Sequence, residues 1–199
     1  MSGTAGQATK SDAAAIAQTL AAAFVDDPPL CWVLSEPDAA SRMERLETFF
    51  GPMVRGAITN GLALHTSGSE AVTLWRLPGR IHPGFFETAR ALPYLRRALG
   101  ESGGRAKAMG DTLKEKAPDF PYWYLQFAGV APGAQGKGLG GKAIRAGLER
   151  ARAQDCPVYL EAAKPGNVAI YQSLGFRIIG EWDIPGGGPH FWGMLCDRP

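Results

Sequence analysis

A glycine-rich stretch at residues 130–141, VAPGAQGKGLGG, constrains this chain more than any other feature. It follows an apolar, aromatic-rich run at residues 122–130, which predicts a buried strand. It precedes residues 142–153, where apolar side chains recur at helical spacing. Because the first N–H groups of a helix are unpaired and carry partial positive charge, this order of elements predicts an anion site. The glycines lack a Cβ atom, so a phosphate group can approach their backbone closely.

Two familiar phosphate-binding patterns can be tested against this stretch. It is not a nucleoside-triphosphate P-loop, because no Gly-Lys-Ser/Thr sequence follows at the required spacing. Gly136, Gly138 and Gly141 satisfy the G-x-G-x-x-G pattern of dinucleotide sites, and Glu161 lies 20 residues further on. That pattern begins at the strand end, whereas residues 131–135 intervene here, and fewer than 60 residues remain for the rest of such a fold. A helix start without a ligand would leave the glycines unexplained, since each costs about 1 kcal/mol relative to alanine within a helix.

The composition is that of a globular chain without strong attraction for polyanions. Hydrophobic residues make up 45% of the 199 residues, and the formal net charge is only +2. We therefore expect neither a nucleic-acid partner nor a membrane partner. The N-terminal segment lacks the basic and apolar regions of a signal peptide, so we expect none. Because Cys31, Cys156 and Cys196 suit neither a disulfide framework nor a zinc site, we expect a cytoplasmic location and no metal.

The remaining pattern predicts one mixed α/β domain over residues 1–199, without an internal repeat or an interdomain linker. Residues 84–118 predict helices that are broken at Pro93 and at Gly103-Gly104. The other predicted elements are helices at residues 12–25, 38–58 and 167–176, strands at 62–66 and 71–77 joined as a hairpin, and strands at 157–161, 177–184 and 190–196.

Two aspartates, Asp26 and Asp27, end the first predicted helix directly before Pro28 and Pro29. Carboxylates at this place could contact a cationic substrate. Acidic residues before prolines also occur in solvated turns, and the sequence leaves both interpretations open.

Three ordered motifs resemble those of the GCN5-related N-acetyltransferases, the GNAT family. Residues 135–140, QGKGLG, resemble the family's Q/R-x-x-G-x-G/A motif, and the preceding GVAP resembles the end of its fourth strand. Residues 167–176, NVAIYQSLGF, resemble its C-terminal Asn…Tyr…Gly-Phe signature. The resemblance covers about residues 122–195 and is greatest for the small-molecule branch that includes puromycin N-acetyltransferase.

The resemblance implies an α/β (α+β) fold, with a mixed, mostly antiparallel sheet flanked by helices and with splayed fourth and fifth strands. Residues 1–120 would form the acceptor-side half of the domain, and residues 121–199 the half that binds acetyl-CoA. The loop would hold the pyrophosphate through backbone N–H groups, and the fourth strand would pair with the pantothenate arm. The residues implied to bind acetyl-CoA are Ala128, Gly129, Val130, Gln135, Gly136, Lys137, Gly138, Leu139, Gly140, Gly141 and Asn167.

Acetyl transfer from a thioester to an amine needs an acid for the leaving thiolate and a base for the ammonium group. Tyr171 lies four residues after Asn167, so both face one side of a short helix, and the family assigns its matching tyrosine the acid role. Many relatives carry a glutamate on the fourth strand, but residues 124–130 contain none. Glu161, at the end of the fifth strand, is the candidate base acting through water, or else a helix cap, and His190 is an alternative.

The sequence therefore predicts an acetyl-CoA-dependent N-acetyltransferase that moves the acetyl group directly to a primary amine of a small molecule. We expect it to act as a monomer or a homodimer. A protein or peptide amine is the alternative acceptor, and a coenzyme A-binding regulatory domain without turnover is the alternative from another class.

Overall fold

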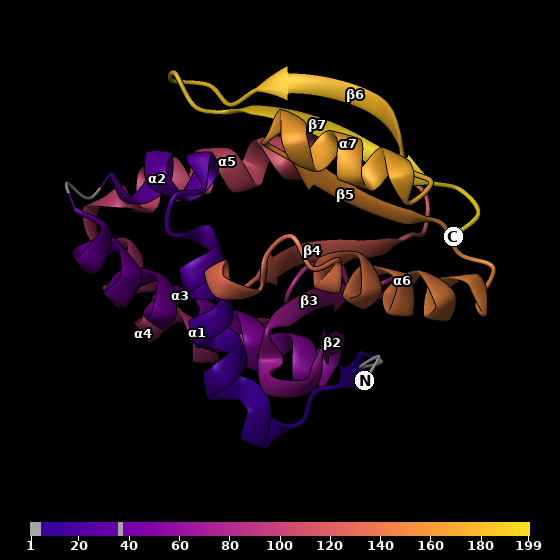
Figure 1. Cartoon of the computed structure of the whole chain (residues 1–199). Coiled ribbons are helices and arrows are strands. Elements are labelled where there is room, and N and C mark those ends of the chain that lie inside the picture. The colour runs from indigo at the N-terminus through magenta and orange to yellow at the C-terminus, as the bar shows by residue number, and fades with distance from the viewer. Residues whose placement is uncertain (1–4, 36–37) are drawn as a thin grey trace.

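The structure is a computed structural model that describes residues 5–35 and 38–199, so Met1–Thr4, part of the segment expected not to be a signal peptide, lie outside the described residues. Within the described ranges, seven strands form one sheet in the order β1-β2-β3-β4-β5-β7-β6 (Figure 1). Neighbouring strands are antiparallel except β4 and β5, which are parallel. The strands are β1 Gly6–Gln7, β2 Leu62–His65, β3 Ala71–Arg76, β4 Trp123–Val130, β5 Val158–Ala162, β6 Arg177–Asp183 and β7 His190–Cys196.

Helices cover both faces of this sheet, each through its own apolar cluster. Leu20 of α1 and Phe50 of α3 are fully buried in one cluster with Leu74 of β3. The next residue of β3, Trp75, faces the other way and joins a second cluster with Leu148 of α6. The helices are α1 Ala13–Phe24, α2 Pro28–Leu34, α3 Ala39–Asn60, α4 Phe85–Leu99, α5 Gly103–Lys116, α6 Leu139–Arg152 and α7 Pro165–Ser173.

The parallel strands β4 and β5 are paired only at one end. Trp123 pairs with Val158 and Tyr124 with Tyr159, and no later residue of β4 pairs with β5 in the described structure. β4 nevertheless continues to Val130, and in Figure 1 the two strands diverge as they run away from their paired end. The expected mixed sheet with splayed fourth and fifth strands is confirmed.

A buried ion pair fixes α4 against the sheet. Arg76, at the end of β3, is 1% exposed, and its Nη1 lies 2.6 Å from Oε1 of Glu87 in α4. Asn60 of α3 donates to the other Glu87 oxygen at 2.9 Å. A Cβ atom at Gly56 would lie 2.3 Å from Glu87 Oε1, so the glycine leaves room for this carboxylate. Three elements distant in sequence therefore meet at one buried charge pair.

Residues 84–118 are helical as predicted, but the break lies elsewhere. α4 continues through Pro93, so the predicted break there is wrong. Proline removes the bond to the carbonyl of Ala89, and both residues are exposed, so water can satisfy that carbonyl. The chain breaks instead in a 3-10 turn at Gly100–Ser102. Gly103 then begins α5 rather than interrupting a helix.

The other predicted elements appear close to their predicted places, with one addition. The apolar segment after Asp27 forms α2, which begins with Pro28 and Pro29 in its first turn. Proline suits this position because its missing N–H would be unpaired there in any case. The two prolines therefore follow the end of α1 and form the start of α2.

Gly147 sets how closely α6 approaches the sheet. A Cβ atom at this position would lie 2.0 Å from Cζ2 of the buried Trp75 ring. We expect Gly147→Ala to lower the free energy of unfolding by about 1–3 kcal/mol, the usual cost of overpacking a core. Urea denaturation measures this, with Gly110→Ala in α5 as the matched control, because nothing lies within 4 Å of its added Cβ atom. An equal effect of both substitutions would contradict the steric account.

Candidate active site

The glycine-rich loop leads from β4 into α6 through left-handed backbone. Gly136 and Gly138 have φ angles of 76° and 72°, a conformation that favours glycine. Gly138 is the N-cap of α6, and its helix start has no side-chain cap. The N–H groups of the first turn therefore lack intrahelical partners and remain able to bind an anion.

Side chains of the loop fold back onto its own backbone. Gln135 Nε2 donates to the carbonyl oxygen of Val130 at 3.3 Å, and Lys137 Nζ donates to that of Gly133 at 3.0 Å. The Ala131 N–H donates to Glu70 at 2.8 Å, which anchors the loop to the neighbouring hairpin. Gln135 and Lys137 thus each connect two parts of the loop.

The end of β4 lies tightly between two helices. A Cβ atom at Gly140 of α6 would lie 3.0 Å from Val130 Cγ2, and one at Gly129 would lie 3.0 Å from Leu20 in α1. Ala128, Gly129 and Val130 pair with β3 along one edge only. Their other edge faces the gap between β4 and β5, so it has backbone groups for an added extended chain.

Glu161 lies on β5 among tyrosines, on the sheet face opposite α7. Tyr124 on β4 donates its hydroxyl hydrogen to Glu161 Oε2 at 2.7 Å. The rings of Tyr122 and Tyr159 pack beside them with centroids 5.3 Å apart. Burial raises the pKa of Glu161 to about 7, and the Tyr124 hydrogen bond partly opposes this. The group can therefore exchange a proton near neutral pH.

Tyr171 lies on α7, with its ring against Phe176 at a centroid distance of 5.8 Å. Burial, with a further contribution from the charge of Asp27, raises the pKa of Tyr171 to about 12. The phenol is therefore protonated at neutral pH. Asn167 lies one turn earlier on the same half-buried side of α7, as the sequence predicts.

The two aspartates after α1 have different environments. Asp26 is exposed and bridges to Arg42 at 3.3 Å. Asp27 is buried, and its Oδ2 lies 3.4 Å from Lys164 Nζ at the start of α7. The solvated-turn interpretation therefore fits Asp26, and Asp27 is a charged group inside the fold. Lys164 was not among the predicted site residues, and its position before Pro165 is only a weak signal.

His190, the alternative base, lies at the start of β7, beside the edge strand β6. Its Nδ1 is 2.8 Å from Asp183 Oδ1, and its Nε2 is 3.6 Å from Glu181 Oε2. These are the flanking residues of the β6–β7 hairpin, so the hairpin already supplies partners for both ring nitrogens.

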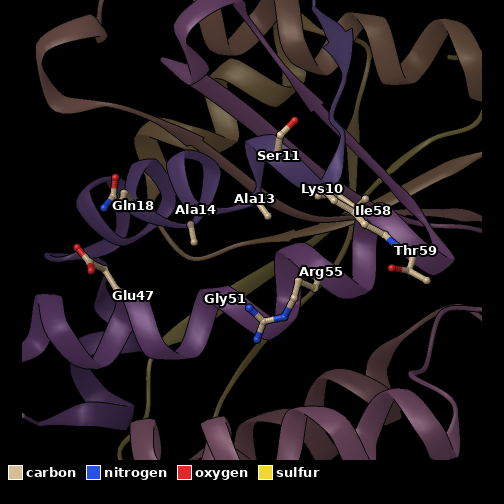
Figure 2. Close-up of a pocket in the computed structure, with 11 residues that line it drawn as sticks. Lys10, Ser11, Ala13, Ala14, Gln18, Glu47, Gly51, Arg55, Ile58 and Thr59 are labelled. Atoms are coloured by element: carbon tan, nitrogen blue, oxygen red, sulfur yellow. The ribbon is translucent and has the colours of Figure 1, made fainter.

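Two open cavities lie elsewhere in the molecule. One of about 540 Å³ runs between the start of α1 and α3, with Lys10, Gln18, Glu47 and Arg55 among its walls (Figure 2). Another of about 400 Å³ lies between α3 and α4. Neither is lined by a predicted site residue. Over the described residues, no helix is long and apolar enough to cross a membrane, and no cluster of three His, Cys, Asp or Glu side chains could hold a metal.

Comparison with known proteins agrees with this geometry. The sequence model of the acetyltransferase (GNAT) family matches residues 88–176. An uncharacterized N-acetyltransferase of Schizosaccharomyces pombe is 29% identical over 172 residues, which cover 80% of this chain and 68% of that protein.

Solved structures extend the likeness to the whole chain. A Corynebacterium glutamicum structure, described as histone acetyltransferase HPA2 and related acetyltransferase, matches over 100% of this chain and 98% of its own, with 26% identity and a TM-score of 0.74. Arylalkylamine N-acetyltransferase 2 of Aedes aegypti shares the fold over 98% of both chains, with 14% identity and a TM-score of 0.66.

The splayed sheet and the glycine loop at its open end define a domain of the acetyltransferase class. The chain is an N-acetyltransferase, and its residues 88–176 match the GNAT family. Members of this family use acetyl-CoA as co-substrate and transfer its acetyl group to amines.

The environment of Glu161 can be tested directly. The Tyr124 hydroxyl group donates to Glu161 and so favours the charged form of the carboxyl group. Tyr124→Phe removes this donor, so we expect the Glu161 pKa to move further above about 7. Carbon-13 NMR titration of the carboxyl group measures both midpoints, and Glu161→Gln identifies the resonance by removing it. A lower midpoint in Tyr124→Phe would contradict the assignment.

Proposed function

We propose that this enzyme transfers the acetyl group of acetyl-CoA directly to a primary amine of a small molecule. The observation that carries the proposal is the gap between β4 and β5, which has the glycine loop at one end and α7 beside it. In this proposal the chain acts as one domain over residues 1–199. Residues 1–120 supply the acceptor side, and residues 121–199 supply the acetyl-CoA side.

The donor fits the residues at the open end of the sheet. The loop at Gln135, Gly136, Lys137, Gly138, Leu139, Gly140 and Gly141 would hold the pyrophosphate, while Ala128, Gly129 and Val130 would pair with the pantothenate amides and Asn167 would contact the same arm. The absence of Cβ atoms at Gly138 and Gly140 supports this fit, because no side chain there keeps the phosphate from the helix start. Bound there, acetyl-CoA supplies an activated thioester.

Tyr171 is proposed as the acid that protonates the departing thiolate. Its pKa of about 12 keeps the proton on the phenol at neutral pH, so it is available for transfer. The half-buried position on α7, in the same helix as Asn167, supports the role.

Glu161 is proposed as the base that removes the acceptor's proton through water. A carboxyl group with a pKa of about 7 is deprotonated in a large fraction of molecules at neutral pH and is a stronger base than an ordinary carboxylate. The rate should therefore rise as the pH passes upward through about 7. Asp27, the buried carboxylate near Tyr171, is proposed to bind the acceptor's ammonium group before that proton is lost.

A small acceptor is favoured over a protein. Among similar structures, the Aedes aegypti protein is named for arylalkylamines, whereas the Corynebacterium glutamicum structure is named for histones. The small-molecule proposal rests on the sequence resemblance to the branch that includes puromycin N-acetyltransferase. We also propose that the enzyme is cytoplasmic, acts as a monomer or homodimer and uses no metal.

An acceptor screen distinguishes the proposal from its alternatives. Release of coenzyme A is measured with puromycin, aminoglycosides, arylalkylamines and N-terminal or lysine peptides. The proposal expects turnover with a small amine. Turnover with peptides alone would favour the protein-acceptor alternative, and binding of acetyl-CoA without turnover would favour the regulatory domain.

The phosphate role of the loop predicts a specific loss of binding. Gly138→Ala forces a side chain into left-handed backbone at a φ of 72°, which costs about 1 kcal/mol or more and displaces the loop N–H groups. We expect the calorimetric dissociation constant for coenzyme A to rise about fivefold or more. Gly133→Ala in the same loop is the control, because its added Cβ atom meets nothing within 4 Å and its φ is not positive. Equal binding by both variants would argue against this loop as the phosphate site.

The acid role of Tyr171 predicts a change in rate rather than in binding. Tyr171→Phe keeps the ring against Phe176 and removes only the hydroxyl group that carries the transferable proton. We expect kcat to fall by about 10²-fold or more while the dissociation constant for acetyl-CoA stays nearly the same. Stopped assays and calorimetry on the same preparation measure the two quantities. An unchanged kcat would assign the proton transfer to another group.

A further inference from the structure

The ion pair between Asp27 and Lys164 joins the two sides of the gap. Asp27 ends the connection from α1 to α2, and α1 packs beside β4 at Gly129. On the other side of the gap, Lys164 lies in the short connection after β5 and is the N-cap of α7. The 3.4 Å contact between Lys164 Nζ and Asp27 Oδ2 therefore connects segments that flank the diverging strands.

The two partners of this pair differ in their access to water. The Asp27 side chain is 12% exposed, whereas that of Lys164 is 37% exposed. Burial raises the pKa of Asp27, and the Lys164 charge acts in the opposite direction. A buried carboxylate without a cation is unfavourable, but a lysine on a flexible stem can return to water. The pair can therefore open from the Lys164 side, and a second cation that takes the place of Lys164 on Asp27 offsets the cost of opening it.

The same carboxylate also acts on the proposed acid. The negative charge of Asp27 contributes to the raised pKa of Tyr171. Lys164, the cation on Asp27, is also the N-cap of the helix that carries Tyr171. In the structure, that cation is a primary ammonium group, the same chemical group that an alkylamine acceptor presents at neutral pH.

We propose that Lys164 is the resident counter-ion of the acceptor site and occupies on Asp27 the place that the acceptor's ammonium group takes. This inference rests on the proposed function. The acceptor is then a cationic alkylamine, which displaces Lys164 into solvent and restores the charge pair. A neutral arylamine has no charge with which to replace Lys164, so the Asp27–Lys164 pair stays in place when such a molecule binds. Asp27 thus selects for cationic acceptors, and Lys164 competes with them.

The test compares a cationic and a neutral probe in matched variants. Phenethylamine is an ammonium ion at neutral pH, and aniline is neutral. For Lys164→Gln, which removes the competing charge, we expect KM for phenethylamine to fall about tenfold, equivalent to about 1.4 kcal/mol. KM for aniline should stay the same, and Lys164→Arg, which keeps the charge, should resemble the parent enzyme. Asp27→Asn combined with Lys164→Gln should abolish the gain for phenethylamine.

A second measurement does not depend on turnover. Calorimetry follows phenethylamine binding to the coenzyme A complex of Tyr171→Phe, with and without Lys164→Gln. Tighter binding after loss of Lys164 supports the inference, whether or not any amine is acetylated. A lack of acetylation with every amine would defeat the proposed function and leave this inference standing. Equal or weaker binding, including no detectable binding in either protein, would overturn the inference. Lys164→Met serves the same comparison if thermal melting shows that Lys164→Gln is not folded.

Discussion

The parallel pairing of β4 with β5 stops after two residue pairs, and the arrangement of the site depends on where it stops. Each strand keeps a partner on its outer edge, β3 for β4 and β7 for β5, so the sheet stays continuous while its middle opens. The backbone along the opened edge needs other partners, because buried N–H and C=O groups are costly when unpaired. An extended ligand arm can form hydrogen bonds with these backbone groups, as a further strand would.

Close packing at glycines places the helix that faces this opening. Gly147 allows α6 to lie directly on the Trp75 ring, and Gly140 brings its first turn against Val130 at the strand end. Larger residues at either position would move the helix start away from β4. The same glycines that make the loop adaptable to a phosphate thus also set its distance from the sheet.

Two carboxyl groups near the site meet the cost of burial in different ways. Glu161 accepts a hydrogen bond from the neutral hydroxyl group of Tyr124, and burial raises its pKa to about 7, so the group can exchange a proton. Asp27 is accompanied by Lys164, whose charge opposes the effect of burial. The first environment suits proton transfer, and the second suits binding of a cation. Both arise from contacts between segments that are distant in sequence.

The sequence alone predicted the strand, the glycine turn and the helix around Gly138, and the Asn167–Tyr171 spacing on one side of α7. These depend on periodicity and on the chemistry of residues adjacent in the chain, which a sequence displays directly. It did not predict that α4 would continue through Pro93, because exposure of the freed carbonyl decided that.

Nor could the sequence distinguish Asp27 from Asp26 or name Lys164. Adjacent aspartates have the same local chemistry, and only the packing of α1, α2 and α7 buries one of them beside a lysine and leaves the other in water. Local pattern therefore determined the elements and the donor loop. Tertiary packing decided which charges are buried together, because burial and charge pairing depend on segments that meet only in the folded chain.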